Sequence, residues 1–263
     1  MDLGLREKVA CVAAASSGLG KASALELARE GARVAICARH EDRLLAAARE
    51  IHQSTGAEVL PVVADVTHPD DVRRFITSAA EQWGRVDVLV TNAGGPPAGT
   101  FEDFSDADWE AAFRLNFLST QRLIQAALPY MKKNRWGRII TITSVSAKQV
   151  LANLILSNAI RAGVHGLVKS LAQELGPYNI TVNAVCPGPI LTERLQALLE
   201  NAVRTQGLTM EEAQSGWVSQ IPLGRLGAPH EFGAVVAFLA SERASFVNGV
   251  LLQVDGGMVK GLL

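Results

Sequence analysis

Short apolar runs alternate with longer amphipathic stretches along the whole chain. Seven runs are rich in β-branched residues and almost continuously hydrophobic, which is typical of strands buried on both faces. Between them, longer stretches repeat apolar residues at the spacing of one helix face. This alternation predicts a parallel sheet built from right-handed crossovers. We predict strands over 8–13, 33–37, 58–63, 86–91, 138–142, 181–185 and 250–254, and helices over 19–30, 42–53, 69–82, 106–133, 157–175 and 229–240.

The number and order of these elements predict one α/β domain. We expect a Rossmann-like, doubly wound fold with a seven-stranded parallel sheet and helices on both faces. No linker or repeat interrupts the 263 residues, so we assign 1–263 to a single domain. Segment 190–221 is irregular and follows the sixth predicted strand, where open α/β sheets bind ligands. We predict a substrate lid there, with a surface insertion as the alternative.

Charge and composition narrow the classes of partner. The formal net charge is −1, which gives no basic field for nucleic acid or an anionic membrane. No leader-like segment begins the chain, and no apolar run approaches the roughly 20 residues that span a bilayer. We therefore expect a cytoplasmic protein that binds a small molecule. The 3 cysteines and 5 histidines lack metal-ligand spacing, so no metal site is predicted.

The first predicted strand leads into a turn of small residues, Ala-Ala-Ala-Ser-Ser-Gly-Leu-Gly, over 13–20. A turn between a strand and a helix presents backbone N–H groups to a pyrophosphate, and small residues let the phosphates approach closely. A negative φ at Ala14 is required if alanine is to fit without strain. The candidate contacts are Ala14, Ser16, Ser17, Gly18, Leu19 and Gly20.

This turn resembles the TGxxxGxG turn of the short-chain dehydrogenase/reductase family, with alanines in place of the Thr and the first Gly. Three later segments also resemble family motifs: an Asp-Val pair that contacts adenine, an Asn-Ala-Gly motif beside the riboses, and a Pro-Gly turn beside the nicotinamide. The order and spacing of the four segments are more specific than any one of them. The resemblance implies cofactor contacts at Asp65, Val66, Asn92, Ala93, Gly94, Pro187, Gly188, Ile190 and Thr192.

The end of the second predicted strand indicates which nicotinamide cofactor is preferred. An acidic residue there would bond the ribose 2′-hydroxyl and repel a 2′-phosphate, but the sequence reads Cys-Ala-Arg-His over 37–40. Arg39 is placed to bind a phosphate in bidentate fashion. We therefore predict NADP(H), with NAD(H) as the alternative cofactor and an exposed flanking charge as the alternative role of Arg39.

The catalytic residues match the family only in part. The resemblance implies a Ser that polarises the carbonyl, a Tyr that donates the proton, a Lys that holds the ribose, and an Asn that supports a proton relay. Asn116 and Ser144 match two of these positions, whereas Ser157 and Arg161 stand where the Tyr-x-x-x-Lys motif is expected. The chain is thus similar to a divergent branch called 3-oxoacyl-(acyl-carrier-protein) reductase-like, with Ser-x-x-x-Arg as its motif.

These replacements change the expected acid–base chemistry. An aliphatic hydroxyl is a much weaker acid than a phenol, so Ser157 does not simply replace a tyrosine. Arg161 keeps a positive charge but holds its proton, and we expect it to contact a ribose or a carboxylate. Lys148, on the loop after Ser144, is the nearest candidate for a substitute acid, although a solvated lysine is the more ordinary interpretation. Packing or exposure is expected of His165.

Three functions remain open from the sequence. The first is an NADP(H)-dependent short-chain oxidoreductase acting on a carbonyl or hydroxyl group, with water, Lys148 or a substrate group as proton donor. The second is a nucleotide-binding regulatory protein. The third is a lyase, isomerase or decarboxylase acting on an acidic substrate held by Arg161, with Ser144 and Ser157 stabilising a developing enolate. The family resemblance also implies a homotetramer, with a homodimer as the alternative.

Overall fold

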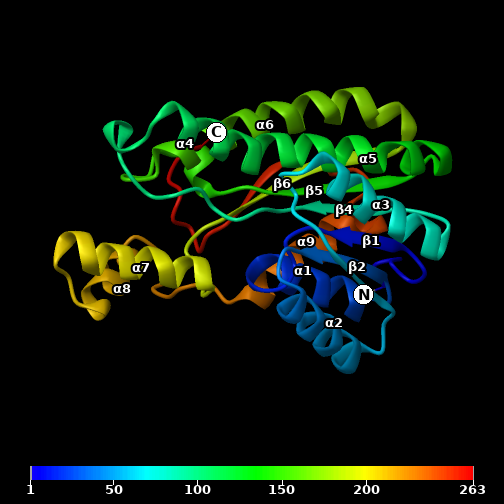
Figure 1. Cartoon of the computed structure of the whole chain (residues 1–263), viewed down its shortest axis with the longest axis horizontal. Helices are drawn as coiled ribbons and strands as arrows, with labels where there is room; N and C mark the ends of the chain where they lie inside the picture. The colour runs from blue at the N-terminus through cyan, green and yellow to red at the C-terminus, as the bar shows by residue number, and fades with distance from the viewer. Residues whose placement is uncertain (1, 263) are drawn as a thin grey trace.

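A computed structural model, which describes residues 2–262, contains one parallel sheet of seven strands (Figure 1). The strand order is β3-β2-β1-β4-β5-β6-β7, and every neighbouring pair is parallel. The predicted seven-stranded, Rossmann-like fold is confirmed. The strands are β1 (Val9–Val12), β2 (Arg33–Ala38), β3 (Val59–Val63), β4 (Val88–Thr91), β5 (Gly137–Ile142), β6 (Ile180–Pro187) and β7 (Leu251–Val254).

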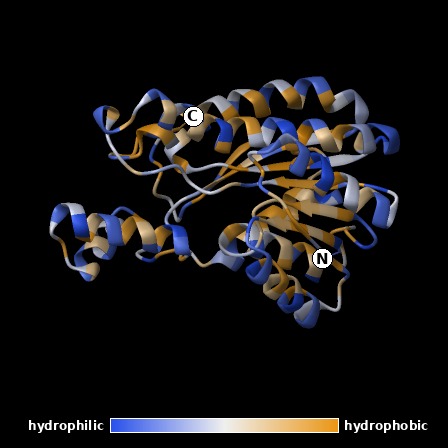
Figure 2. Ribbon diagram, viewed as in Figure 1, coloured by the Kyte–Doolittle hydropathy of each residue, from blue (hydrophilic) through white to orange (hydrophobic). Residues whose placement is uncertain are grey.

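Helices cover both faces of this sheet. Helices α1 (Gly18–Arg29), α2 (Glu41–Thr55) and α9 (Pro229–Ala240) pack on one face, and α3 (Pro69–Trp83), α5 (Ser119–Asn134) and α6 (Ile155–Leu175) pack on the other (Figure 1). Successive strand residues point to opposite faces, so Val12 joins the first core layer and Cys11 the second. Figure 2 shows the strands as the hydrophobic centre and the helices with polar outer surfaces.

Two predicted segments differ from the structure. The long helix predicted over 106–133 is divided into α4 (Asp106–Phe113), a π-helical turn over Arg114–Leu118, and α5. Segment 190–221, predicted as irregular, forms α7 (Glu193–Gln206) and α8 (Met210–Val218), which extend away from the sheet on one side of the molecule (Figure 1). These two helices have a small apolar cluster of their own, which includes Leu195, Leu199 and Ala213.

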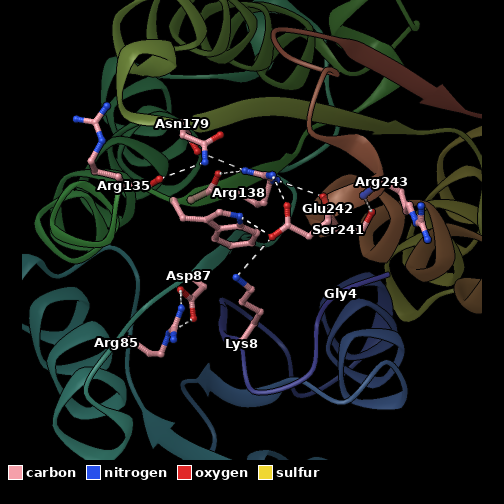
Figure 3. A network of polar contacts seen from close by, with 12 residues as sticks. Gly4, Lys8, Arg85, Asp87, Arg135, Arg138, Asn179, Ser241, Glu242 and Arg243 are labelled. Atoms are coloured by element: carbon pink, nitrogen blue, oxygen red, sulfur yellow. Dashed lines mark hydrogen bonds and ion pairs between the residues drawn. The ribbon is translucent and has the colours of Figure 1, made fainter. Parts of the chain in front are cut away.

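A network of polar contacts lies at the amino-terminal end of the sheet, around Arg138 (Figure 3). The Arg138 side chain is fully buried there and donates to the carbonyl oxygens of Gly137 and Ser241 at 2.9 and 3.3 Å. Its Nη2 lies 3.5 Å from a carboxylate oxygen of Glu242, and its guanidinium lies 4.3 Å from the centre of the Trp136 ring. This buried cation is therefore balanced by an anion and an aromatic face.

The structure shows the state of the three cysteines and whether any helix could span a membrane. Cys11, Cys37 and Cys186 are free and buried, as predicted. Burial raises the thiol pKa of Cys37 to about 12, which makes it unreactive. Within 2–262, every helix is too short or too polar to cross a membrane.

Candidate active site

A cavity of about 590 Å³ lies at the carboxyl ends of the strands. The loops that follow β1 to β6 all contribute to its walls, and α7 and α8 add further side chains. This is the location where open α/β sheets bind ligands. The predicted site residues that line the cavity are Ala14, Ser16, Ser17, Gly18, Leu19, Arg39, Asp65, Val66, Asn92, Ala93, Gly94, Ser144, Ser157, Arg161, Pro187, Gly188, Ile190 and Thr192.

The turn after β1 presents the amino end of α1 to the cavity. Ser17 is the N-cap residue, and its side chain makes no capping hydrogen bond, so the first N–H groups of α1 are not satisfied by it. Gly20 lies behind the cavity, where a Cβ would come within 2.4 Å of the Ala14 carbonyl oxygen. Asn92 fixes the turn by donating from Nδ2 to that same oxygen at 3.2 Å. The turn is thus preorganised to bind an anion.

Ala14 corrects one expectation of the sequence. Its φ is +48°, in the left-handed region, and not negative as an unstrained alanine requires. The family motif has glycine at this position, where no Cβ clashes with the backbone. The turn therefore keeps the glycine geometry and carries a strain of about 1 kcal/mol.

The cavity wall near the end of β2 carries a second arginine and an acidic residue in addition to the predicted Arg39. Arg39 lines the cavity, and so do His40 and Arg43 in the beginning of α2. Arg43 pairs with Glu193, the first residue of α7, and this ion pair keeps the pKa of the Glu193 carboxyl low. Neither partner was a sequence candidate. Arg43 lies in the first turn of α2, only four residues after Arg39 in the sequence, so it was the nearest further cation to consider.

Three serine side chains lie near the carboxyl end of β5. The Ser144 Oγ accepts a hydrogen bond from the backbone N–H of Ser146 at 3.0 Å. Among residues 2–262 nothing accepts the Ser144 hydroxyl proton, which remains free to be donated to a ligand. The Oγ atoms of Ser146 and Ser157 lie 2.9 Å apart. The residue at the family's tyrosine position thus bonds to a neighbouring serine.

Arg161 is held at the carboxyl end of β5. It is 8% exposed, and its Nη1 donates to the carbonyl oxygens of Thr143 and Ile142 at 3.0 and 3.2 Å. Burial, together with the nearby positive charge of Arg194, lowers the pKa of its guanidinium to about 10. The side chain is still a cation at neutral pH.

The π-helical turn places Asn116 beside the strand ends. Its Nδ2 donates to the Gly94 carbonyl oxygen at 2.9 Å, and its backbone carbonyl accepts from the Thr120 hydroxyl at 3.0 Å. Its Oδ1 is buried without a partner in the described part of the chain. Asn116 does not line the cavity, so it supports the Gly94 segment from behind. A π-helical turn inside an α-helix is frequent at functional sites.

The structure does not bring Lys148 into the cavity. Its Nζ points to β7 and donates to the Leu251 carbonyl oxygen at 3.4 Å. This geometry gives no support to its candidacy as the proton donor. His165 is buried, and its Nε2 lies 2.9 Å from the Thr143 hydroxyl oxygen. Burial lowers the pKa of the imidazole to about 4, so the side chain is neutral and has the packing role expected of it.

Arg194 is a cavity residue that the sequence did not indicate. It lies in the first turn of α7 and donates from Nη2 to the Pro96 carbonyl oxygen at 2.7 Å. A Cβ on Gly95 would come within 2.6 Å of the Arg194 Nε, so glycine makes the room for this side chain. The contact joins α7 to the loop after β4, 98 residues away in sequence.

The chain is similar to known reductases over almost its whole length. Residues 13–259 match the family model described as Enoyl-(Acyl carrier protein) reductase. The 3-oxoacyl-(acyl-carrier-protein) reductase FabG of Thermotoga maritima is 36% identical over 97% of this chain and 99% of its own. The NADPH-dependent reductase BacG of Bacillus subtilis is 32% identical over 98% of this chain and 100% of its own.

A solved structure agrees with these relatives. The L-sorbose reductase of Gluconobacter frateurii, complexed with NADPH and L-sorbose, superposes with a TM-score of 0.94 and is 34% identical, with 100% of both chains covered. At this identity and coverage, the shared fold reflects common descent. The chain belongs to the short-chain dehydrogenase/reductase family, among the relatives of 3-oxoacyl-(acyl-carrier-protein) reductase.

Proposed function

We propose that the protein is an NADP(H)-dependent oxidoreductase that reduces a carbonyl group, or forms one, beside Ser144. The observation that carries this proposal is the single cavity that unites an anion-binding turn, Arg39 and Arg43, and a serine hydroxyl with a free proton. The BacG and L-sorbose reductase relatives, whose names or titles mention NADPH, support it.

The residues present fit a dinucleotide with a 2′-phosphate. The amino end of α1 binds the pyrophosphate, and Arg39 with Arg43 binds the 2′-phosphate. A Cβ at Gly94 would meet nothing within 4 Å, so this glycine leaves open space beside the strand ends. When bound, NADPH supplies the hydride.

The chain's own residues then act on the carbonyl group. Ser144 donates its free hydroxyl proton as a hydrogen bond to the carbonyl oxygen, and the Arg161 cation stabilises the negative charge that develops there. Ser157 and Ser146 are too weakly acidic to complete the reduction as acids. With Lys148 directed to Leu251, we propose that water or a group of the substrate supplies the proton.

The test begins with equilibrium titration of the purified protein with NADPH and NADH, followed by fluorescence. Single-turnover oxidation of bound NADPH is then measured against a panel of ketones and aldehydes. We expect NADPH to bind more tightly and some carbonyl compound to be reduced. Binding without turnover of any compound would favour the regulatory or the non-redox function instead, and product formation without a change in the nicotinamide absorbance would identify the latter.

A matched pair of serine variants locates the chemistry. Ser144→Ala removes the proposed carbonyl donor and should lower kcat by about 10²-fold or more without changing the Kd for NADPH. Ser170→Ala removes an exposed hydroxyl from the same protein, where it bonds only to the Gly166 carbonyl of α6. That control should leave both quantities unchanged.

We further propose that the protein assembles as a homotetramer in which the α4–α6 face forms one of the interfaces. An apolar groove on this face is lined by Trp109, Phe113, Phe117 and Ile160. Phe113 is 42% exposed although it stacks on Phe117, so the monomer leaves a large aromatic side chain uncovered. Light scattering coupled to size-exclusion chromatography tests the assembly, and Phe113→Glu should reduce it to a smaller species.

A further inference from the structure

The charged side chains of the cavity are unevenly balanced. Four arginines line it, whereas the acidic side chains on its walls are two. One of the acids, Glu193, is already paired with Arg43. Asp65 lies after β3 and accepts hydrogen bonds from the Thr67 N–H and hydroxyl at 2.9 and 2.8 Å. The positive charges at the other end of the cavity therefore have no acidic partner on its walls.

Arg161 is the clearest case of an uncompensated cation. None of the ion pairs within residues 2–262 includes it, and both of its hydrogen bonds come from Nη1 alone. Arg138, the other deeply buried guanidinium, has Glu242 beside it (Figure 3) and lies 4.3 Å from the centre of the Trp136 ring. Burying an unpaired charge is costly, so a cation retained without an anion indicates a ligand that supplies one.

Arg194 brings a second cation to the same part of the cavity. It forms no ion pair within the described residues, and its charge is close enough to lower the pKa of Arg161. Only the Pro96 carbonyl accepts a hydrogen bond from its guanidinium, at Nη2, so among the described residues its Nη1 has no acceptor, and the side chain lines the cavity. Two guanidinium groups that repel each other across an open space are stabilised when an anion lies between them.

The dinucleotide does not account for both cations. Its pyrophosphate and 2′-phosphate have binding groups at the amino end of α1 and at Arg39 and Arg43. Ser144, the proposed carbonyl donor, lies on the same side of the cavity as Arg161, because both are anchored at the carboxyl end of β5. Leu151, Leu154 and Trp217 complete an otherwise apolar wall there.

We propose that the substrate is a small oxo acid whose carboxylate is bound by Arg194, with Arg161 adding to the positive potential, while its ketone oxygen meets Ser144. A planar carboxylate suits the fork of a guanidinium, which can bind it in bidentate fashion. Apolar wall residues accommodate the carbon skeleton between the two polar ends. This inference rests on the proposed function for the position of the ketone, but the recognition of the carboxylate is measured without turnover.

The experiment compares acids with their esters on the protein saturated with NADP⁺. The probes are 2-oxopentanoate, 4-oxopentanoate and 5-oxohexanoate, each with its methyl ester, and binding is followed by calorimetry. At least one acid should bind about tenfold or more tightly than its ester. Arg194→Met should abolish this preference, and Arg194→Lys should keep part of it because the charge remains. Arg161 is left unchanged in this comparison, because it is also proposed to stabilise charge at the ketone oxygen and its replacement would change two contacts of the substrate at once.

A matched control lies on the same helix. Arg204→Met removes an equal charge from an exposed position of α7, where the side chain bonds to Asn201, and it should keep the preference for the acid. Equal binding of acids and esters, absence of binding by every acid, or an unchanged preference in Arg194→Met would overturn the inference. If NADP⁺ itself does not bind, the proposed function fails, and the same titrations on the protein alone still decide whether carboxylates are recognised.

Discussion

Arg43 and Glu193 form an ion pair that joins helix α2 to the beginning of helix α7 beside the cofactor cavity. Glu193 also accepts a hydrogen bond from the Ser17 hydroxyl at 3.5 Å, so its carboxylate reaches the anion-binding turn. A carboxylate in this position competes with phosphate groups for the same cation and the same turn. The pair therefore links binding of NADP(H) to the position of α7, the helix that carries Arg194.

This pairing predicts opposite effects of two substitutions on NADPH affinity. Arg43→Gln removes a charge-assisted contact to the 2′-phosphate and should raise the Kd for NADPH by about tenfold, while Glu193→Gln removes the competitor and should lower it. Parallel titrations with NADH provide the control, because NADH lacks the 2′-phosphate. An equal effect of Arg43→Gln on both cofactors would contradict the assignment of Arg43 to that phosphate.

The strained turn gives a prediction on stability. Replacing Ala14 by glycine relieves the Cβ clash at φ +48° and should raise the free energy of unfolding by about 0.5–1 kcal/mol. Ala15→Gly is the matched control, since Ala15 is buried and is not among the residues with positive φ. That change should lower stability by about 1 kcal/mol, through the lost methyl group and the added freedom of the unfolded chain. Urea unfolding at constant pH measures both, and a loss of stability in Ala14→Gly would show that the turn is not strained.

The sequence predicted the sheet and most of the cavity wall for a simple reason. Parallel strands buried on both faces have long apolar runs, and their carboxyl ends meet at one edge, so the residues that follow them, such as Asp65 and Asn92, line one cavity as the sequence predicts. Signals for α7 and α8 were also present but overlooked. Thr192 caps the first, and Thr209 with Glu212 forms a capping box at the second.

Other features of the cavity depend on contacts that no local pattern encodes. Arg194 reaches Pro96 across 98 residues, and Arg43 reaches Glu193 across 150. The direction of the Lys148 side chain depends on β7, which is 103 residues further along the chain. The positive φ of Ala14 is imposed by the strand-to-helix turn, against the preference of the residue. In each case the partner, the side-chain direction or the backbone angle depends on tertiary contacts, which composition and spacing do not encode.

Burial of His165 predicts a loss of stability in mild acid. Burial lowers its pKa to about 4 from the ordinary value of 6.5, so the unfolded chain binds a proton that the folded chain refuses. The contribution of this neutral imidazole is complete above pH 6.5 and is lost as the pH falls towards 4, by up to about 3 kcal/mol. Denaturant unfolding at several pH values should show this slope, and His165→Gln should show a shallower one. An equal slope in both proteins would mean that other groups cause the acid sensitivity.

Ser157 and Arg161, which stand where the family motif has Tyr and Lys, lead to a prediction about turnover. Ser157 lines the cavity and bonds only to the Ser146 hydroxyl, and Arg161 lies one helical turn further on in α6, so the two positions share one face. The double variant Ser157→Tyr with Arg161→Lys places a phenol in the cavity next to an ammonium group that lowers the phenol pKa. General acid catalysis typically contributes about 10²–10⁴-fold, so kcat for a neutral ketone should rise by about 10²-fold or more.

Two features of the double variant separate acid catalysis from a general change in the site. Its pH–rate profile should show an ionisation below the ordinary phenol pKa of about 10, which the parent protein lacks. Arg161→Lys alone provides the control, because it changes the cation without adding an acid and should not raise kcat. If the double variant binds NADPH with unchanged affinity and still does not reduce neutral ketones faster, the proton donor is not what limits this site. The carboxylate bound by Arg194 would then be the requirement that neutral ketones fail to meet.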